Sequence, residues 1–270
     1  MRETLTRTLS GLVYIILLTV SIFYSQYSFI ILFGVFLLAA TGEFAELVKL
    51  PKILCLVLAA LSYCLFTIFP ISHLTSLLLL AATMFVASNC IAFLFDKQNR
   101  ELDGTAKYVF LFGYVILPFI LLTKIPFMDY TYQLYRPEIM ISIFVIIWTN
   151  DTFAFVVGKT IGQTKLFERI SPKKTVEGFI GGLGFAILAA SLIAWYYIKE
   201  PVHIWIITAL IVAIVGTVGD LIQSKLKRIA NVKDSGSIMP GHGGILDRLD
   251  SIIFAGPFVY LFYQILYFFP

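Results

Sequence analysis

The stretch VHIWIITALIVAIVGTVGDLIQ, residues 202–223, is followed directly by SKLKRIANVKDSGSIMPGHGGILDRLD, residues 224–250. The first segment is an apolar run long enough to cross a bilayer as a helix. The second segment carries five basic and three acidic residues, one histidine and four glycines in 27 positions. A charged, glycine-rich loop between two apolar helices indicates a site where anions and a metal ion meet a membrane.

The rest of the chain shares the apolar character of the first segment. Of its 270 residues, 59% are hydrophobic and 13% are charged, and the mean hydropathy is +0.92. Only helices and closed barrels satisfy their backbone hydrogen bonds inside a bilayer. The apolar runs are too continuous for the alternating strands of a barrel. The sequence therefore predicts an all-α polytopic integral membrane protein.

Nine apolar segments have the length of a membrane span. The first lacks a small-residue cleavage site, so we interpret it as a retained helix and not as a removed signal peptide. An odd number of spans places the two termini on opposite faces of the membrane. The predicted spans are 8–24, 27–45, 52–69, 73–95, 106–127, 138–158, 176–198, 202–223 and 249–269.

Lysine and arginine are unevenly divided between the two sets of predicted loops. With nine spans, 17 of the 20 basic residues fall on the face that holds the N-terminus. Such residues accumulate on the cytoplasmic side of membrane proteins. We therefore expect a protein of the cytoplasmic membrane with a cytoplasmic N-terminus, a C-terminus on the opposite face and an active site that faces the cytoplasm.

The two parts of the chain differ in polarity. Residues 1–137 hold about five spans that are almost entirely apolar, which we interpret as N-terminal transmembrane helices. Residues 138–270 hold four spans and the two basic loops 159–175 and 225–248, which we expect on the cytoplasmic side. We interpret this second part as the transmembrane catalytic region.

A few carboxylates interrupt the apolar spans. Asp151 is expected roughly 10 Å below the end of its helix, at 1.5 Å per residue. An ionisable residue at that depth is a functional candidate, and a polar contact between helices is the alternative. Glu43 and Glu46, near the end of the second span, are expected either to be solvated at the interface or to pair with a lysine.

One helix face collects polar side chains at the end of the 202–223 span. Asp220, Gln223, Ser224 and Lys227 stand at i, i+3, i+4 and i+7, which places them on the same side of a helix. Carboxylate oxygens facing a wet cleft are suitable ligands for a hard cation such as Mg²⁺. The pattern favours Asp220 as a metal ligand.

Two helix N-termini carry the features of anion sites. Lys174 precedes the 176–198 span, where free backbone N–H groups and the helix dipole favour anions; positive-inside lysines beside a helix cap are the alternative. The Gly-rich turn around His242 precedes Asp247, Arg248 and Asp250 at the start of the last span. Helix capping explains one aspartate well but not two with an arginine. His242 is expected either to bind phosphate or to brace the loop.

The spacing of these residues resembles the phosphatidate cytidylyltransferases, also called CDP-diacylglycerol synthases. The resemblance is specific over residues 148–251 and rests on hydropathy and length alone before residue 140. A second stretch with the family's pattern consists of Ser171, Pro172, Lys174, Thr175, Glu177 and Gly178. The main signature is carried by Ser224, Lys227, Arg228, Lys233, Asp234, Pro240, His242, Gly243, Gly244, Asp247, Arg248 and Asp250, with Met239 where the family usually has Leu, Ile or Phe.

The resemblance implies that CTP and phosphatidate are converted to CDP-diacylglycerol and pyrophosphate with Mg²⁺, and a second cation is compatible with it. Membrane lipids are the expected surroundings, a homodimer is permitted by small-residue faces, and no nucleic acid is expected as a partner. We expect Asp220, Asp247, Lys227 and Arg248 to be catalytic, with Asp220, Asp247, Asp250 and Asp151 as metal ligands. The residues expected to bind substrate are Lys174, Ser224, Arg228, Lys233, His242, Gly243 and Gly244.

Three other functions remain open from the residues. Asp151 and Asp220 could be relays in a cation-coupled transporter of an anionic solute. Another lipid-linked phosphotransferase is disfavoured because the DGxxAR pattern of the CDP-alcohol phosphatidyltransferases is missing from the sequence. A purely structural membrane protein is the weakest alternative, because buried charge is costly without a use. No residue in the sequence selects cytosine over another base.

Overall fold

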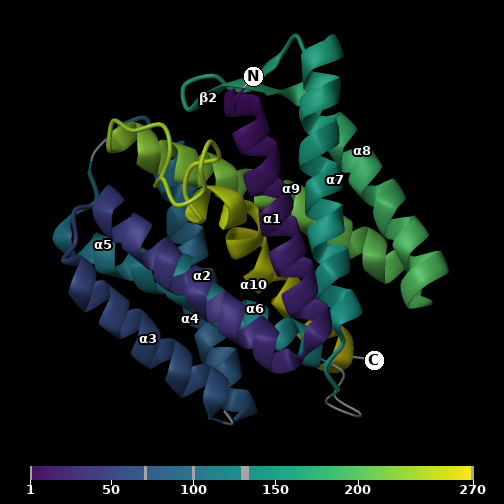
Figure 1. Ribbon diagram of the computed structural model, residues 1–270, viewed down its shortest axis with the longest axis horizontal. Helices are drawn as coiled ribbons and strands as arrows, with labels where there is room; N and C mark the ends of the chain where they lie inside the picture. Colours follow the sequence, from purple (N-terminus) through teal and green to yellow (C-terminus); the bar gives the residue numbers. More distant parts are fainter. Residues whose placement is uncertain (1, 70–71, 99–100, 129–133, 269–270) are drawn as a thin grey trace.

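The computed structural model describes residues 2–69, 72–98, 101–128 and 134–268. Four helices come first in the chain: α1 (Arg2–Tyr24), α2 (Gln26–Leu47), α3 (Lys52–Ile68) and α4 (His73–Phe95). One long segment follows, in which α5 (Gly104–Phe110), the π-helix η1 (Leu111–Ile116), α6 (Leu117–Lys124) and the 3₁₀ turn η2 (Ile125–Phe127) run without a break. The later elements are α7 (Pro137–Ile161), β1 (Lys165–Phe167), β2 (Ser171–Thr175), α8 (Val176–Leu192), the π-helix η3 (Ile193–Ile198), α9 (Val202–Ile229) and α10 (Leu246–Phe268), as Figure 1 shows.

The protein is an all-α polytopic membrane protein, as the hydropathy predicts. Eight helical segments in the described ranges are long and apolar enough to cross a membrane. The remaining predicted span, 52–69, corresponds to a shorter apolar helix, Lys52–Thr67. All nine predicted segments are therefore helical, while the number that cross the membrane and the sides of the two termini stay predictions.

The two basic loops are shorter than predicted. Helix α7 continues to Ile161, and the chain then forms an antiparallel hairpin in which Lys165 faces Thr175 and Phe167 faces Ser171. Helix α9 continues to Ile229 and α10 begins at Leu246, so the second loop is residues 230–245 and not 225–248. The sequence predicts that each loop begins where an apolar run ends. A helix can continue beyond that point with polar residues, so the observed loops are shorter.

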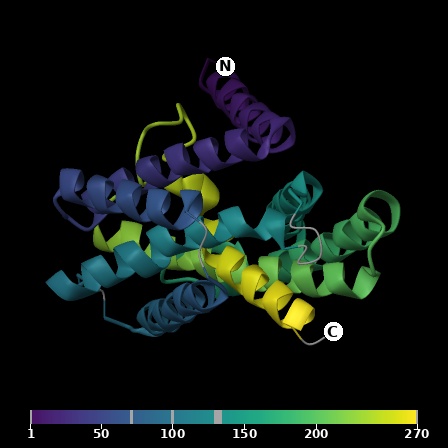
Figure 2. The ribbon, with the colours of Figure 1, turned by 90° about the horizontal axis from the view of Figure 1, so that it is seen from below.

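Helix α10 lies in the interior of the molecule. It packs along α9 and also contacts α6, α4 and α2, whereas α3 and α8 lie at opposite sides of the view in Figure 1. Figure 2 shows α1 at one edge, on the same side as the connection between α9 and α10. Interior aromatic rings join α2 to its neighbours, since Phe33 lies 6.3 Å from Phe119 and 6.4 Å from Phe144 between ring centroids.

Glycines bring the site-bearing helices close together. A Cβ added at Gly182 of α8 would lie 2.6 Å from the Asn150 carbonyl oxygen of α7. A Cβ added at Gly219 of α9 would lie 2.8 Å from the Asp250 carbonyl oxygen of α10. Small residues at such crossings allow backbones in membranes to approach closely. The backbone around Asp220 is therefore packed directly against the first turns of α10.

Candidate functional site

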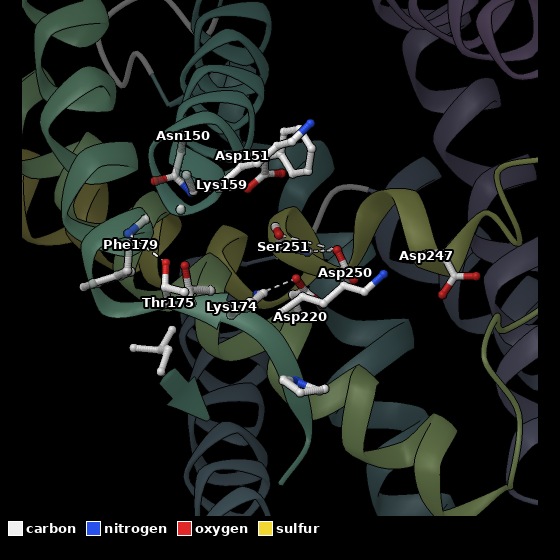
Figure 3. Close-up of a pocket in the computed structure, with 18 of the residues that line it drawn as sticks. Asn150, Asp151, Lys159, Lys174, Thr175, Phe179, Asp220, Asp247, Asp250 and Ser251 are labelled. Carbon is white, nitrogen blue, oxygen red and sulfur yellow. Dashed lines mark hydrogen bonds and ion pairs between the residues drawn. The ribbon is translucent and has the colours of Figure 1, made fainter. Parts of the chain in front are cut away.

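A pocket of about 640 Å³ opens between α7, the β2–α8 junction, α9 and the start of α10 (Figure 3). Its walls combine both signs of charge with apolar groups, and segments from the second half of the chain provide all of them. The acidic residues in the wall are Asp151, Asp220, Asp234, Asp247 and Asp250, and the basic ones are Lys159, Lys165, Lys173, Lys174, Lys227 and Arg248.

Lys174 and Asp220 bring the hairpin to α9. The Lys174 Nζ lies 2.5 Å from Asp220 Oδ2, and both side chains are about one-third exposed. Ser224, one helical turn further along α9, donates a 3.2 Å hydrogen bond to Asp220 Oδ1. The helix-face prediction is confirmed for these two residues. Thr175 accepts a hydrogen bond from Gly178 N and caps α8, which fixes the strand that carries Lys174.

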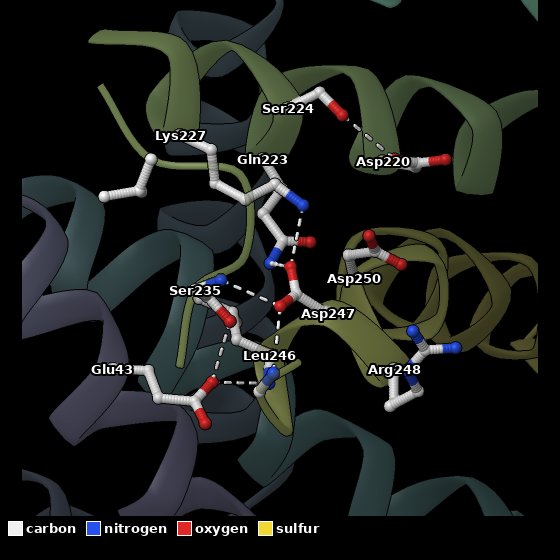
Figure 4. Close-up of polar contacts among 12 residues, drawn as sticks. Glu43, Asp220, Gln223, Ser224, Lys227, Ser235, Leu246, Asp247, Arg248 and Asp250 are labelled. Carbon is white, nitrogen blue, oxygen red and sulfur yellow. Dashed lines mark hydrogen bonds and ion pairs between the residues drawn. The ribbon is translucent and has the colours of Figure 1, made fainter. Parts of the chain in front are cut away.

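Asp247, in the first turn of α10, is the most heavily hydrogen-bonded carboxylate of the site. Its Oδ1 lies 2.7 Å from Lys227 Nζ and accepts a 3.1 Å hydrogen bond from Gln223 Nε2. Its Oδ2 accepts from the backbone N–H groups of Ser235 and Gly244 at 2.8 and 2.9 Å. Figure 4 shows this network between α9, the loop and α10. In this arrangement Asp247 organises the loop, and its predicted contact with a metal stays a prediction.

Three wall carboxylates, Asp250, Asp151 and Asp234, have no cation in ion-pair contact among the described residues. Asp250 is 9% exposed, and its Oδ1 accepts a 2.7 Å hydrogen bond from Ser251 N. Asp151 of α7 faces the pocket and accepts a 3.2 Å hydrogen bond from Asn150 Nδ2. These carboxylates keep oxygen atoms available to a ligand.

Arg248 reaches the pocket while it also supports the glycine-rich turn. Its Nε and Nη2 donate to the His242 carbonyl oxygen at 3.1 and 2.6 Å. The His242 side chain does not line the pocket, and its Nδ1 lies 2.8 Å from the Ser10 Oγ of α1. Desolvation by burial, together with the positive charges of Arg248 and Arg7, lowers the pKa of His242. The geometry matches the bracing alternative for this histidine.

The remaining predicted substrate ligands do not line the pocket. Gly243, at φ +85°, makes the turn, and Gly244 donates its N–H to the Asp247 carboxylate. Arg228 and Lys233 are exposed, and the Arg228 Nη1 donates to the Val232 carbonyl oxygen. Ser224 contacts the pocket wall only through its hydrogen bond to Asp220 among the contacts described. Substrate binding by these residues stays a prediction.

Two charged residues, Glu43 and Lys225, are buried in contacts between helices that the sequence analysis does not predict. Glu43 of α2 is 5% exposed and accepts three hydrogen bonds from the loop and from α10, so the expectation of solvation or lysine pairing is wrong for it. Lysine pairing holds for Glu46, whose Oε1 lies 2.5 Å from Lys52 Nζ. Lys225 is fully buried and donates to the carbonyl oxygens of Phe93 and Asp96. An ionisable residue inside an apolar helix was the only signal for Glu43.

The pocket residues fit a magnesium ion that is shared with a substrate. The described parts of the chain contain no group of three or more His, Cys, Asp or Glu that could hold a metal ion by itself. Mg²⁺ commonly uses only one or two protein carboxylates, with substrate phosphates and water as the other ligands. Asp220 and Asp250 both face the pocket, and Asp250 has no cationic partner in contact. This donor set suits such an ion.

The fold and the pocket together define an integral membrane protein with a charged site, rich in lysines and carboxylates, enclosed by apolar helices. The chain belongs to the cytidylyltransferase family, whose model matches residues 5–266. It is 47% identical over 117 residues to the phosphatidate cytidylyltransferase of Bacillus subtilis, a segment that covers 43% of this chain and 44% of that protein.

Two further relatives carry the same name. The phosphatidate cytidylyltransferase of Staphylococcus aureus strain COL is 49% identical over 116 residues, which cover 42% of this chain and 44% of that protein. The phosphatidate cytidylyltransferase of a Synechocystis species is 48% identical over 132 residues, which cover 47% of this chain and 44% of that protein. The matched segment thus spans less than half of the length of these relatives.

Proposed function

We propose that the protein is a phosphatidate cytidylyltransferase that makes CDP-diacylglycerol and pyrophosphate from CTP and phosphatidate. The observation that carries the proposal is the Lys174–Asp220 pair, which joins the two charged segments at one pocket between apolar helices. Both substrates are polyanions, so basic side chains are needed to gather them against their mutual repulsion. Membership of the cytidylyltransferase family supports the nucleotide class.

In the proposed reaction a phosphate oxygen of phosphatidate attacks the α-phosphorus of CTP. A new P–O bond forms, the bond between the α-phosphorus and the bridging oxygen breaks, and pyrophosphate leaves with that electron pair. The lipid phosphate is already an oxygen nucleophile, so no protein nucleophile and no covalent enzyme intermediate are required. Catalysis is then mostly positioning and charge neutralisation.

In the proposed function, the cationic side chains of the pocket bind the phosphate groups of the two substrates. Lys174 and Lys227 are each paired with a carboxylate, and those pairs place both ammonium groups at the pocket wall. The Arg248 guanidinium has a planar fork that suits a phosphate group. Asp220 and Asp250, with Asp247 and Asp151 beside them, would hold Mg²⁺, which when bound supplies charge neutralisation of the phosphate oxygens.

We also propose that acyl chains leave the pocket beside Phe155 and Phe179. Phe155 lines the pocket on α7 and is 67% exposed, and Phe179 of α8 lines the same wall. Exposed apolar side chains on a membrane helix face lipid. A diacyl substrate could therefore leave its chains in the bilayer while its phosphate reaches Lys174. We further propose that this pocket faces the cytoplasm, where CTP is found, as the distribution of basic residues indicates.

The test uses purified protein in mixed micelles with phosphatidate, Mg²⁺ and each nucleoside triphosphate in turn, and follows pyrophosphate release. Release with CTP, matched by a CDP-lipid product and abolished by EDTA, supports the proposal. Asp220→Asn serves as the inactive control. The absence of release with every nucleotide from folded protein would overturn it. Flux of an anionic solute in liposomes without turnover would instead favour the transporter.

A further inference from the structure

Glu43 is a buried carboxylate in the part of the chain that provides no wall of the pocket. It lies on α2, and its two oxygens receive three hydrogen bonds from the loop 230–245 and the first residue of α10 (Figure 4). Ile245 N donates to Oε1 at 2.9 Å, while Leu246 N and Ser235 Oγ donate to Oε2 at 2.9 Å each. The carboxylate therefore connects Ser235, in the first half of the loop 230–245, to the residues where that loop ends and α10 begins.

The chemistry of a helix start explains why a carboxylate is suited to this place. The first backbone N–H groups of a helix lack intrahelical acceptors, and the helix dipole favours a negative charge there. The loop packs closely around the carboxylate, since a Cβ added at Gly236 would lie 2.7 Å from Glu43 Oε1. No lysine, arginine or histidine forms an ion pair with Glu43 among the described residues.

Ser235 connects Glu43 to the pocket. Its hydroxyl donates to Glu43, and its backbone N–H donates to Asp247 Oδ2 at 2.8 Å. The other oxygen of Asp247 lies 2.7 Å from Lys227 Nζ. A continuous series of charge-assisted hydrogen bonds thus runs from α2 through the loop to a carboxylate and an ammonium group in the pocket wall.

We propose that Glu43 is a positioning residue for the active site. Its carboxylate fixes Ser235 and the first turn of α10, and this in turn fixes the orientation of Asp247 and of Lys227. The inference rests on the proposed function, because it assigns Glu43 to the same reaction. Glu43 does not line the pocket, so it acts only through these neighbours.

The experiment compares Glu43→Gln with Glu46→Gln. Glu46 lies on the same helix three residues later, but it is exposed and pairs only with Lys52, so it is a matched control. Glutamine keeps the size of Glu43 and removes its charge and one of its two acceptor oxygens. We expect kcat for CDP-lipid formation to fall by about 10–100-fold in Glu43→Gln, as for residues that orient a metal-site ligand, and to stay unchanged in Glu46→Gln.

A second variant separates positioning from stability. Ser235→Ala keeps the acceptor for Ile245 N and Leu246 N but breaks the link to Glu43. If the link carries the effect, Ser235→Ala lowers kcat in protein with an unchanged unfolding temperature, and the double variant is no worse than Glu43→Gln alone. Full kcat in folded Ser235→Ala would overturn the proposal even if Glu43→Gln failed to fold, and strictly additive effects would overturn it where all three variants fold.

Hydrogen exchange gives a readout that does not depend on turnover. We expect faster amide exchange at Ser235, Ile245 and Leu246 in Glu43→Gln than in the wild type and in Glu46→Gln. Unchanged amide exchange at these three residues would overturn the proposed positioning role of Glu43. If the wild type releases no pyrophosphate with CTP, the proposed function fails. The effect of Glu43 on the loop and the start of α10 is then tested by the exchange measurement alone.

Discussion

Lys174 Nζ and Asp220 Oδ2 lie 2.5 Å apart across the pocket, one on the hairpin and one on α9. The two residues lie 46 positions apart in the sequence, so the contact forms only because the tertiary fold brings β2 next to α9. In the proposed function, the pair places a cation that would bind phosphate beside a carboxylate that would bind Mg²⁺. Substrate phosphates and Mg²⁺ would satisfy the same two charges.

Replacing Lys174 with glutamine removes the cation from this contact. We expect kcat for CDP-lipid formation to fall by about 100-fold, as for the loss of one donor that stabilises developing negative charge. Steady-state kinetics in mixed micelles would measure this change. Lys97→Gln, in the exposed connection after α4, is the control and should leave kcat unchanged. Equal activity of both variants would contradict a role for Lys174.

Asp220→Asn keeps the shape of the side chain but removes its charge. We expect Mg²⁺-dependent turnover to be abolished while the protein stays folded, because asparagine keeps an oxygen that can accept the hydrogen bond from Ser224. A titration of activity against Mg²⁺, with the unfolding temperature measured in parallel, checks this. Retained activity at ordinary Mg²⁺ concentrations would refute the assignment of Asp220 as a metal ligand.

Arg248→Lys separates the charge of the side chain from its shape. The guanidinium donates two hydrogen bonds to the His242 carbonyl oxygen, and an ammonium group cannot reproduce that planar fork. We expect the lysine variant to lose activity almost as far as Arg248→Gln. Kinetics of the two variants side by side would show it, and wild-type turnover by Arg248→Lys would count against the role.

The lowered pKa of His242 predicts that the stability of the folded protein depends on pH. Burial and the charges of Arg248 and Arg7 lower the pKa of His242 in the folded protein, whereas the unfolded chain should titrate near about 6.5. The unfolded state then binds more protons, so this contribution to stability is present above pH 6.5 and is lost as pH falls toward the folded pKa. The unfolding temperature should drop more for the wild type than for His242→Asn between about pH 7.5 and 5.5. Equal drops would show that His242 does not contribute.

Lys225 should contribute to stability and not to the chemistry. Its ammonium group donates to the carbonyl oxygens of Phe93 and Asp96 at the end of α4 and lies 4.3 Å from the Phe93 ring centroid. Lys225→Met would leave the partly buried Phe93 carbonyl oxygen without this donor, which costs about 1–3 kcal/mol, whereas the Asp96 carbonyl oxygen keeps its hydrogen bond from Arg169. Equilibrium unfolding in detergent measures the loss, and the exposed Lys97→Met should show none.

The helices could be predicted because hydropathy is a local property of the sequence. All nine predicted segments are helical, and the face of Asp220 and Ser224 follows from the helical repeat. The predicted ends are less accurate, since α9 continues to Ile229 through charged residues that follow the apolar run. The short strands of the hairpin have too few residues to show a period.

The site was predictable as a set of residues but not as a set of contacts. The charged segments indicated Lys174, Lys227 and Asp247, and the structure brings them to one pocket. Nothing local to Glu43 shows that it binds the start of a helix formed two hundred residues later, because that contact depends on how α2 packs on α10. For the same reason, the sequence does not show that Gly244 N donates to Asp247, while the predicted binding of phosphate by the turn glycines stays a prediction.

The most direct test follows the two ends of the nucleotide separately. Protein and phosphatidate are incubated with Mg²⁺ and CTP that is labelled with ³²P at either the α or the γ position. Nucleotidyl transfer predicts that the α label appears in the lipid fraction and the γ label appears only in pyrophosphate. Appearance of the γ label in the lipid, or of no label in the lipid from either nucleotide, would contradict the account.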